Sequence, residues 1–132
     1  MSGDDEEAIA LDTTQAIAVL NNTGAGTWIR PFTRVCLPAP VVGELLYGAL
    51  NSGRPESNRR RVETLIARCE VLPVGAATAG AYARVRLGLK RKGRPIPEND
   101  VWIAALARQH DLTLVSRDRH FSNVDRLRFE TW

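Results

Sequence analysis

"RPIPENDVWIAALARQHDLTLVSRDRH", residues 94–120, joins two elements of regular structure with almost no loop between them. Prolines and acids open an apolar segment that we expect to form a helix over 97–110, and the β-branched, apolar run over 112–116 predicts a buried strand. Asp100 lies in the first turn of this helix, and Asp118 lies two residues beyond the strand. Because a buried carboxylate is costly without a cation or hydrogen-bond donors, the two aspartates predict a compensating partner.

The alternation of helix and strand continues through the rest of the chain. Continuous apolar strand runs that alternate with helices predict an α/β fold. Since chains of this length usually form one core, we expect a single domain, 1–132, built as a three-layer α/β/α sandwich around a central parallel sheet. Further strands are predicted at 8–12, 34–38, 70–74 and 128–131, and further helices at 13–21, 39–53, 54–69 and 76–93, with a short helix at 27–32.

The composition is that of a globular protein. Hydrophobic residues make up 44% of the chain and charged residues 25%, which excludes a disordered or fibrous class. An acidic N-terminus and the absence of an apolar run of about 18 residues predict a cytoplasmic protein with no membrane contact. Cys36 and Cys69 each stand alone in apolar surroundings, so we expect buried thiols rather than a disulfide or a zinc site.

Positive charge is concentrated in one part of the sequence. Residues 53–94 carry eleven lysines and arginines against three acids, a net charge of +8, whereas the remainder carries seven basic and twelve acidic residues, a net charge of −5. This distribution indicates one region that binds a polyanion and an acidic remainder that binds a cation. Solvated helix faces would produce the same pattern.

Four acids fall where predicted strands and helices meet. Asp12 and Asp118 come at the ends of strands, whereas Glu44 and Asp100 come early in helices. In parallel α/β sheets the ligand crevice lies at the carboxyl ends of the strands, so the four carboxylates are expected to converge there. Their mutual repulsion predicts a divalent cation, and ligation by oxygen alone matches Mg²⁺ or Mn²⁺. Such a site can hydrolyse a phosphodiester, and the basic segment would hold the backbone phosphates.

Each of these acids, taken alone, also has an ordinary structural role. Asp100 could be an ordinary acid at the start of a helix, where it interacts favourably with the helix dipole, and Asp12 could be a turn or cap residue. Asp118 could pair with a neighbouring arginine at the surface. Glu44 is the most informative of the four, because it stands among apolar residues near the start of its helix.

Three stretches make this sequence similar to a known family. They are "ALDTT" (10–14), "VVGELLYGA" (41–49) and "RPIPENDVWIAALARQHDLTLVSRDRHF" (94–121), and with the terminal Trp132 they resemble PIN domains. Among PIN domains, the chain is most similar to the VapC-type toxins of bacterial toxin–antitoxin pairs. The combination of "GELLYGA" and "ENDVWIAA" carries most of the specificity, since "LDT" alone is a weak motif.

The resemblance implies a PIN-like fold and a Mg²⁺- or Mn²⁺-dependent endoribonuclease that acts as a toxin. Asp12 and Asp100 take the positions of the direct metal ligands, and Glu44 and Asp118 complete the acidic motif. The family resemblance also implies RNA as the substrate, a homodimer, and a VapB-like antitoxin that inserts a peptide near the active site.

Several further residues are candidates at the same site or on its surroundings. Thr13 and Ser116 are expected to hold the acids by hydrogen bonds, with capping or turn roles as the alternative, and Thr13 or Thr14 is expected to cap the helix at 13–21. Thr14 departs from the family, which commonly has Asn or Ser there, but its hydroxyl can still bond a carboxylate. The candidates for RNA or antitoxin contact are Arg59, Arg60, Arg61, Arg84 and Arg86.

Two rival functions are compatible with parts of this pattern. A non-catalytic RNA- or protein-binding module would keep the fold and the basic helices, and it would bind RNA with a steep salt dependence and without turnover. A phosphoacceptor of the receiver-domain kind also gathers carboxylates at a parallel sheet. It needs a lysine near them, whereas Lys90 and Lys92 both lie on the predicted basic helix.

Overall fold

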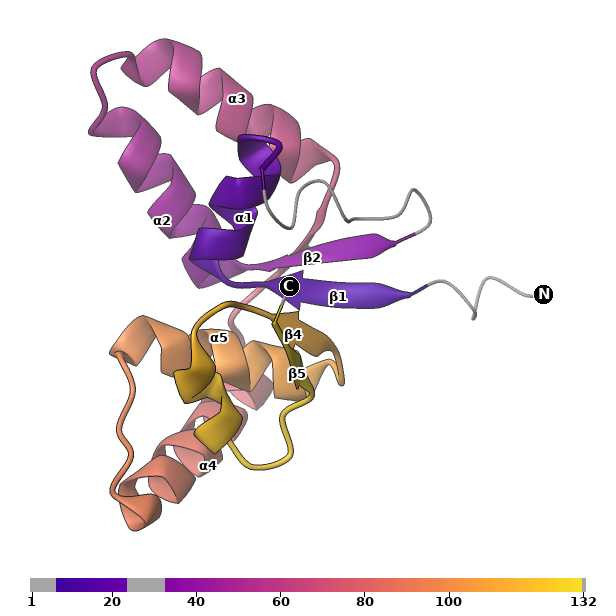
Figure 1. The fold of residues 1–132 in the computed structure, drawn as a ribbon, viewed down its shortest axis with the longest axis vertical. Coiled ribbons are helices and arrows are strands. Elements are labelled where there is room, and N and C mark those ends of the chain that lie inside the picture. The colour runs from indigo at the N-terminus through magenta and orange to yellow at the C-terminus, as the bar shows by residue number, and fades with distance from the viewer. Residues whose placement is uncertain (1–6, 24–32, 132) are drawn as a thin grey trace, which may run out of the picture.

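A central sheet of five parallel strands organises the molecule (Figure 1). The computed structural model describes residues 7–23 and 33–131, so the helix expected at 27–32 and the terminal Trp132 lie outside the described residues. The strand order is β3-β2-β1-β4-β5, and every neighbouring pair is parallel. The strands are β1 (Ala8–Leu11), β2 (Arg34–Pro38), β3 (Glu70–Leu72), β4 (Thr113–Val115) and β5 (Phe129–Glu130).

Helices cover both faces of this sheet, which confirms the predicted three-layer α/β/α sandwich. Figure 1 shows α1, α2 and α3 on one side of the sheet and α4 and α5 on the other. A proline in the first turn starts α2 and α3, and Gly93, in a left-handed conformation with φ of 65°, ends α4. The helices are α1 (Thr13–Leu20), α2 (Ala39–Leu50), α3 (Pro55–Ala67), α4 (Ala76–Lys92) and α5 (Glu98–Gln109), followed by the 3₁₀ helix η3 (Arg119–Asn123).

The core lies between the sheet and its helices. Strands β1, β2 and β4 bury most of their side chains, and α5 is buried continuously from Ile103 to Ala107. Burial on this scale stabilises the fold by about 25 cal/mol for each Å² of apolar surface removed from water. Cys36 is buried and Cys69 half-buried, both are free thiols, and burial raises the pKa of Cys69 to about 11. The prediction of a buried thiol is confirmed for Cys36, whereas Cys69 is only partly buried.

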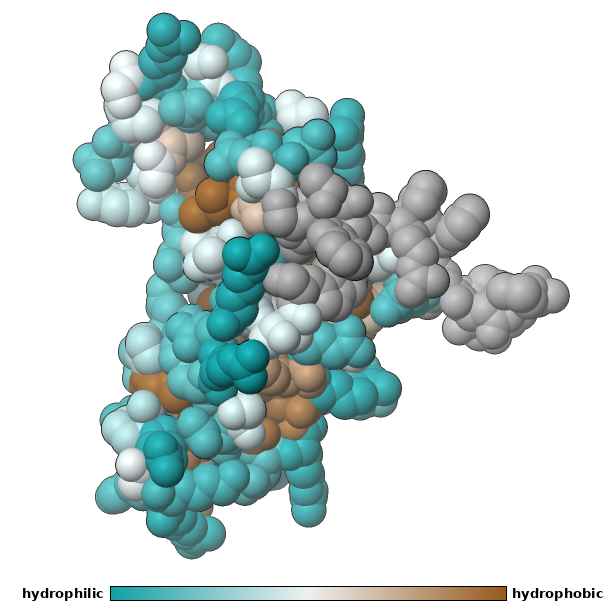
Figure 2. All heavy atoms as spheres, viewed as in Figure 1, coloured by the Kyte–Doolittle hydropathy of each residue, from teal (hydrophilic) through white to brown (hydrophobic). Residues whose placement is uncertain are grey.

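The surface is mostly hydrophilic, with hydrophobic side chains visible beside α1 and α2 (Figure 2). None of the helices in the described ranges has both the length and the apolar character needed to cross a membrane.

The order of the strands reverses between β1 and β4. The chain steps outward from β1 to β2 to β3, and then crosses to the opposite side of β1 to form β4. In parallel α/β sheets such a reversal opens a crevice at the carboxyl ends of the two strands. Asp12 directly follows β1 and Ser116 directly follows β4, so both lie at this reversal.

Candidate functional site

Asp12 is buried at the junction between β1 and α1, where only 6% of the residue is exposed. It is the N-cap of α1: its backbone is extended, and its Oδ1 accepts a hydrogen bond from the Gln15 amide at 3.0 Å. The expectation that Thr13 or Thr14 caps this helix is therefore wrong, because both residues already lie within it. Burial raises the pKa of Asp12, and the bonds from Ser116 and Gln15 offset only part of that effect.

Ser116 connects the ends of the two central strands. It is fully buried, and its hydroxyl donates to Asp12 Oδ2 at 2.5 Å while its oxygen accepts from the Asp118 amide at 2.9 Å. One hydroxyl thereby holds the carboxylate that follows β1 and the backbone that follows β4.

Glu44 lies where α1, α2 and α5 approach one another. Its Oε1 accepts hydrogen bonds from Thr13 Oγ1 at 3.0 Å and from Asn99 Nδ2 at 3.1 Å. These two donors come from the first turns of α1 and α5, so they orient the carboxylate of a half-buried side chain on α2. The glutamate among apolar residues is thus placed by specific polar contacts.

Asp100, in the first turn of α5, interacts electrostatically with all three of the other acids. Burial raises its pKa first, and the charges of Asp12, Asp118 and Glu44 raise it further, while the neighbouring His120 lowers it. The four carboxylates expected to converge are therefore close enough to interact. Their convergence at the sheet reversal is a property of the tertiary structure, since 88 positions separate the first of them from the third.

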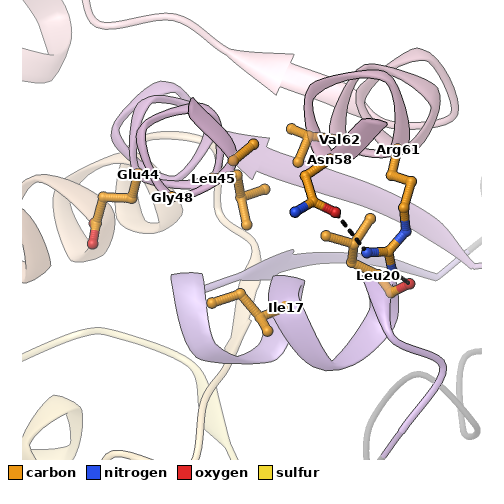
Figure 3. A pocket seen from close by; sticks show the side chains of 9 residues that line it. Ile17, Leu20, Glu44, Leu45, Gly48, Asn58, Arg61 and Val62 are labelled. Atoms are coloured by element: carbon orange, nitrogen blue, oxygen red, sulfur yellow. Dashed lines mark hydrogen bonds between the residues drawn. The ribbon is translucent and has the colours of Figure 1, made fainter. Parts of the chain in front are cut away.

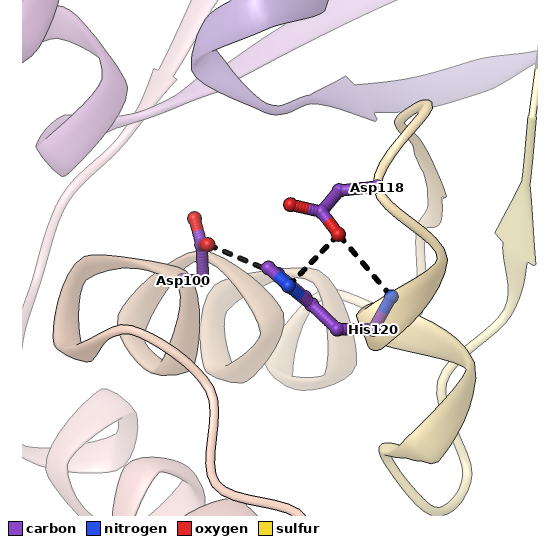
Figure 4. A group of neighbouring side chains, drawn as sticks. All are labelled: Asp100, Asp118 and His120. Carbon is purple, nitrogen blue, oxygen red and sulfur yellow. Dashed lines mark hydrogen bonds and ion pairs between the residues drawn. The ribbon is translucent and has the colours of Figure 1, made fainter.

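His120 is a site residue that the sequence alone did not single out. It lies in η3 between two acids, with Nε2 at 3.0 Å from Asp100 Oδ2 and Nδ1 at 2.8 Å from Asp118 Oδ1 (Figure 4). The contact with Asp100 has the distance of an ion pair but not the alignment of a hydrogen bond. A protonated imidazole can donate to both carboxylates, whereas a neutral one can donate to only one.

The position of His120 also changes the expected set of metal ligands. Asp100, Asp118 and His120 offer ligand atoms that all lie within 4.8 Å of one another. An imidazole nitrogen therefore lies beside the carboxylate oxygens that the sequence predicts as metal ligands. The feature that could have identified His120 is its spacing: it follows Asp118 by two residues in "SRDRH", which a tight turn after a strand folds back toward the aspartate.

The acid cluster suits a divalent cation. Burial and mutual repulsion raise the pKa of both Asp12 and Asp100, so negative charge in the site is only partly compensated by the protein. Carboxylate oxygens are the ligands that hard divalent cations prefer. Lys92 is bound to Asp125 Oδ1 at 2.5 Å, and Lys90 is exposed on α4, so the arrangement lacks the lysine that a receiver-like phosphoacceptor needs.

The basic segment, expected to bind a polyanion, does not form one continuous surface. Its two helices lie at opposite ends of the molecule, on opposite faces of the sheet (Figure 1). The two helices are close in the sequence, but the edge strand β3 lies between them along the chain, so they pack on different faces.

The five candidate arginines have different surroundings. On α3, Arg59 is engaged by Glu56 and Glu63 at 2.9 and 2.7 Å, and Arg60 is exposed. Arg61 donates to Leu20 O and Asn21 Oδ1 of the α1 segment. On α4, Arg84 is exposed, and Arg86 donates to the Tyr82 hydroxyl at 2.9 Å and lies over its ring, which stacks on Trp102.

A groove runs between α1, α2 and α3, close to the acid cluster (Figure 3). It has a volume of about 200 Å³ and an apolar wall that includes Ile17, Leu45 and Val62. Glu44 lies at one end and Arg61 at the other. Because Glu44 also belongs to the acid cluster, the groove leads directly to the site.

Comparison with known proteins identifies the family. The model of the PIN domain matches residues 9–127. A tRNA(fMet)-specific endonuclease VapC of Shigella flexneri is 35% identical over 127 residues, covering 92% of this chain and 96% of that protein. Ribonuclease VapC2 of Haemophilus influenzae is 37% identical over 100 residues, covering 75% of this chain and 76% of that protein. The crystal structure of VapBC2 from Rickettsia felis, bound to a promoter DNA fragment, superposes with a TM-score of 0.85 at 25% identity over 95% of this chain and 98% of that one. The chain therefore belongs to the PIN domain family, and its relatives within that family are VapC ribonucleases.

Proposed function

We propose that this protein is a divalent-metal-dependent endoribonuclease that acts as the toxin of a type II toxin–antitoxin pair. The observation that carries the proposal is the convergence of Asp12, Glu44, Asp100 and Asp118 at the point where the strand order reverses. Relatives named as VapC ribonucleases and neighbours solved as VapBC complexes support the same activity and the same kind of partner.

Asp12 and Asp100 are the proposed metal ligands, with Glu44 and Asp118 completing the acidic site. Mg²⁺ is the expected ion and Mn²⁺ the alternative, and a bound divalent cation supplies Lewis-acid polarisation of a phosphoryl oxygen and an activated water. Both oxygens of Asp12 already accept one hydrogen bond each, and each retains a free lone pair for a further partner.

The other polar residues of the site hold these acids in place. Ser116 and the Gln15 amide fix the carboxylate plane of Asp12, and Thr13 and Asn99 fix that of Glu44. His120 holds Asp100 and Asp118 together and offsets part of their charge. Partners of this kind typically change activity by about 10–100-fold when they are removed.

RNA is the proposed substrate, and the cytoplasm is the proposed location. Arg60, Arg84 and Arg86 remain candidates for contact with RNA, because their guanidinium groups reach solvent without a carboxylate partner among the described residues. Arg59 is the weakest of the original candidates, since two glutamates engage it.

A VapB-like antitoxin is the proposed protein partner, and the groove between α1, α2 and α3 is its proposed binding surface. Apolar walls suit an antitoxin segment, and the end of the groove at Glu44 would direct that segment to the acid cluster. Arg61, at the opposite end, is the candidate for antitoxin contact. A homodimer is proposed from the family resemblance alone, and sedimentation velocity would test it.

The decisive experiment compares RNA cleavage by the wild-type protein and by Asp100→Ala with Mg²⁺, with Mn²⁺ and with EDTA. Transfer RNA is the first substrate to test, because the Shigella flexneri relative is named for cleaving tRNA(fMet). We expect cleavage with either metal, none with EDTA, and none by the variant. Cleavage in EDTA or by Asp100→Ala would refute the mechanism, and salt-sensitive binding without any turnover would favour a non-catalytic RNA-binding module.

A further inference from the structure

A second cavity, lined by arginines, lies at the far end of α5 from the acid cluster. It has a volume of about 310 Å³ and is formed by the C-terminal half of α4, the last turn of α5 and the segment at 125–126. Four guanidinium groups line it: those of Arg84, Arg91, Arg108 and Arg126. In Figure 1 this segment follows η3 and lies beside α4, at the opposite end of the molecule from α3.

The charge of this cavity is strongly positive. Asp125 is the acid among its lining residues, and its carboxylate is bound by Lys92 Nζ at 2.5 Å. Lys92 lowers the pKa of Asp125 first, and Arg108 and Arg126 lower it further. In the described ranges, no carboxylate lies within ion-pair distance of the four arginines. Because Lys92 already pairs with the one acid of the lining, Asp125, four arginines around one hollow favour an anionic ligand.

The local backbone brings these groups together at some cost. Arg126 has a left-handed conformation with φ of 61°, which is unfavourable for a residue other than glycine. The Asp125 carboxylate lies beside Gly88 of α4, where a Cβ would be in ordinary van der Waals contact with Asp125 Oδ2 at 3.7 Å. The segment is thus held against α4 by Lys92 and Asp125, and Arg126 is presented to the cavity.

We propose that this arginine-lined cavity binds phosphate groups of the RNA backbone and holds the substrate away from the point of cleavage. Arginine suits this ligand because its planar guanidinium binds phosphate oxygens in pairs. Eight residues of α5 separate Asp100 from Arg108, which corresponds to about 12 Å along the helix axis, so one RNA strand can reach both sites. The assignment rests on the proposed ribonuclease function and adds a binding site to it.

The test is the affinity of fluorescently labelled tRNA for the full chain in EDTA, measured by anisotropy at several salt concentrations. The variant is Arg91→Gln/Arg108→Gln, and the control is Arg54→Gln/Arg68→Gln, which removes two charges from the two ends of α3. We expect the variant to bind about tenfold more weakly and the slope of log K against log salt to fall by about 1–2, while the control stays near wild type. Thermal unfolding establishes that both proteins are folded.

The outcomes separate this proposal from the proposed function. Equal affinities and slopes for variant and control would overturn the phosphate site while leaving cleavage in Mg²⁺ intact. Tight binding of pyrophosphate without any loss of tRNA affinity in the variant would also overturn it, because the cavity would then hold a small phosphate compound. Loss of antitoxin binding with unchanged tRNA affinity would overturn it in favour of an acidic protein partner. If the wild type fails to cleave RNA, the proposed function fails, but the affinity measurement still decides the cavity.

Discussion

At the scale of single residues, the site acids are held in a state that costs stability. Asp12 and Asp100 both have a raised pKa, chiefly because burial disfavours their ionised forms. The neighbouring carboxylates add repulsion to that effect. A buried carboxylate with a raised pKa destabilises the folded protein when no cation is bound. Binding of a cation therefore explains these two acids better than a contribution to stability does.

Replacing Asp100 with asparagine should therefore stabilise the metal-free protein while abolishing its activity. At neutral pH the substitution removes a partly buried charge that three other carboxylates repel, so we expect a gain of about 0.5–2 kcal/mol in the free energy of unfolding in EDTA. Urea unfolding monitored by circular dichroism measures this difference. Adding Mg²⁺ should stabilise the wild type and not the variant. A variant that is less stable than wild type in EDTA would contradict this account.

The same comparison has a defined pH dependence. Because the folded pKa of Asp100 is raised above its ordinary value of 3.8, the folded state holds this proton more tightly than the unfolded state does. The stability that Asp100 contributes to the metal-free protein falls as the pH rises from 3.8 through the folded pKa. The advantage of Asp100→Asn should thus be small below pH 3.8, grow across that window and then stay constant. An advantage that shrinks as the pH rises would have the wrong sign.

At the scale of elements, Asp12 serves both the fold and the site. One carboxylate oxygen caps α1 through the Gln15 amide, and the other binds Ser116 after β4. The cap of α1 and the proposed metal site therefore use the same side chain, so truncating it would affect both.

Two substitutions at Asp12 separate these roles. Asparagine caps helices about as well as aspartate, whereas alanine does not, and the loss of a cap costs about 1 kcal/mol. We expect Asp12→Asn to retain the stability of α1 and Asp12→Ala to lose about 1 kcal/mol or more, while both variants lose RNA cleavage. Urea unfolding and a tRNA cleavage assay measure the two effects. If Asp12→Asn cleaved RNA at the wild-type rate, the carboxylate would have no catalytic role.

At the scale of the whole molecule, the two helical layers offer different surfaces. The layer of α1, α2 and α3 carries an apolar groove that ends at Glu44, and the layer of α4 and α5 carries the arginine-lined cavity. This division predicts that the antitoxin and the far part of the RNA contact opposite faces of the sheet, and that both reach the acid cluster from their own side.

A charge placed in the groove should weaken the antitoxin complex. Ile17 lines the groove and is 43% exposed in the free protein, so Ile17→Glu would bury an unpaired carboxylate against the antitoxin. We expect affinity for the cognate antitoxin to fall by at least about 30-fold, roughly 2 kcal/mol, in titration calorimetry. Val74→Glu, a similarly exposed position beyond β3, is the matched control. Equal affinities for the two variants would place the antitoxin elsewhere.

The elements follow from local chemistry and were predictable from the chain. Apolar runs and helical spacing predict β2 with its exact bounds and most other elements within a few residues. The pattern is informative because each helix buries one apolar face and each strand is a short apolar run. The acids were predictable as a group, since Asp12, Glu44, Asp100 and Asp118 stand where strands end and helices begin.

Local sequence patterns could not predict the features that depend on contacts between distant segments. His120 lies between two acids because η3 folds back against α5. The basic segment divides because its helices α3 and α4, joined through the edge strand β3, pack on opposite faces of the sheet. Arg108 joins Arg84 and Arg91 in one cavity only after α5 packs against α4. Arg126 joins them where the segment after η3 is bound to α4 through Lys92 and Asp125. Periodicity records which side of an element is buried, whereas the neighbours that meet there are set by packing across the sheet.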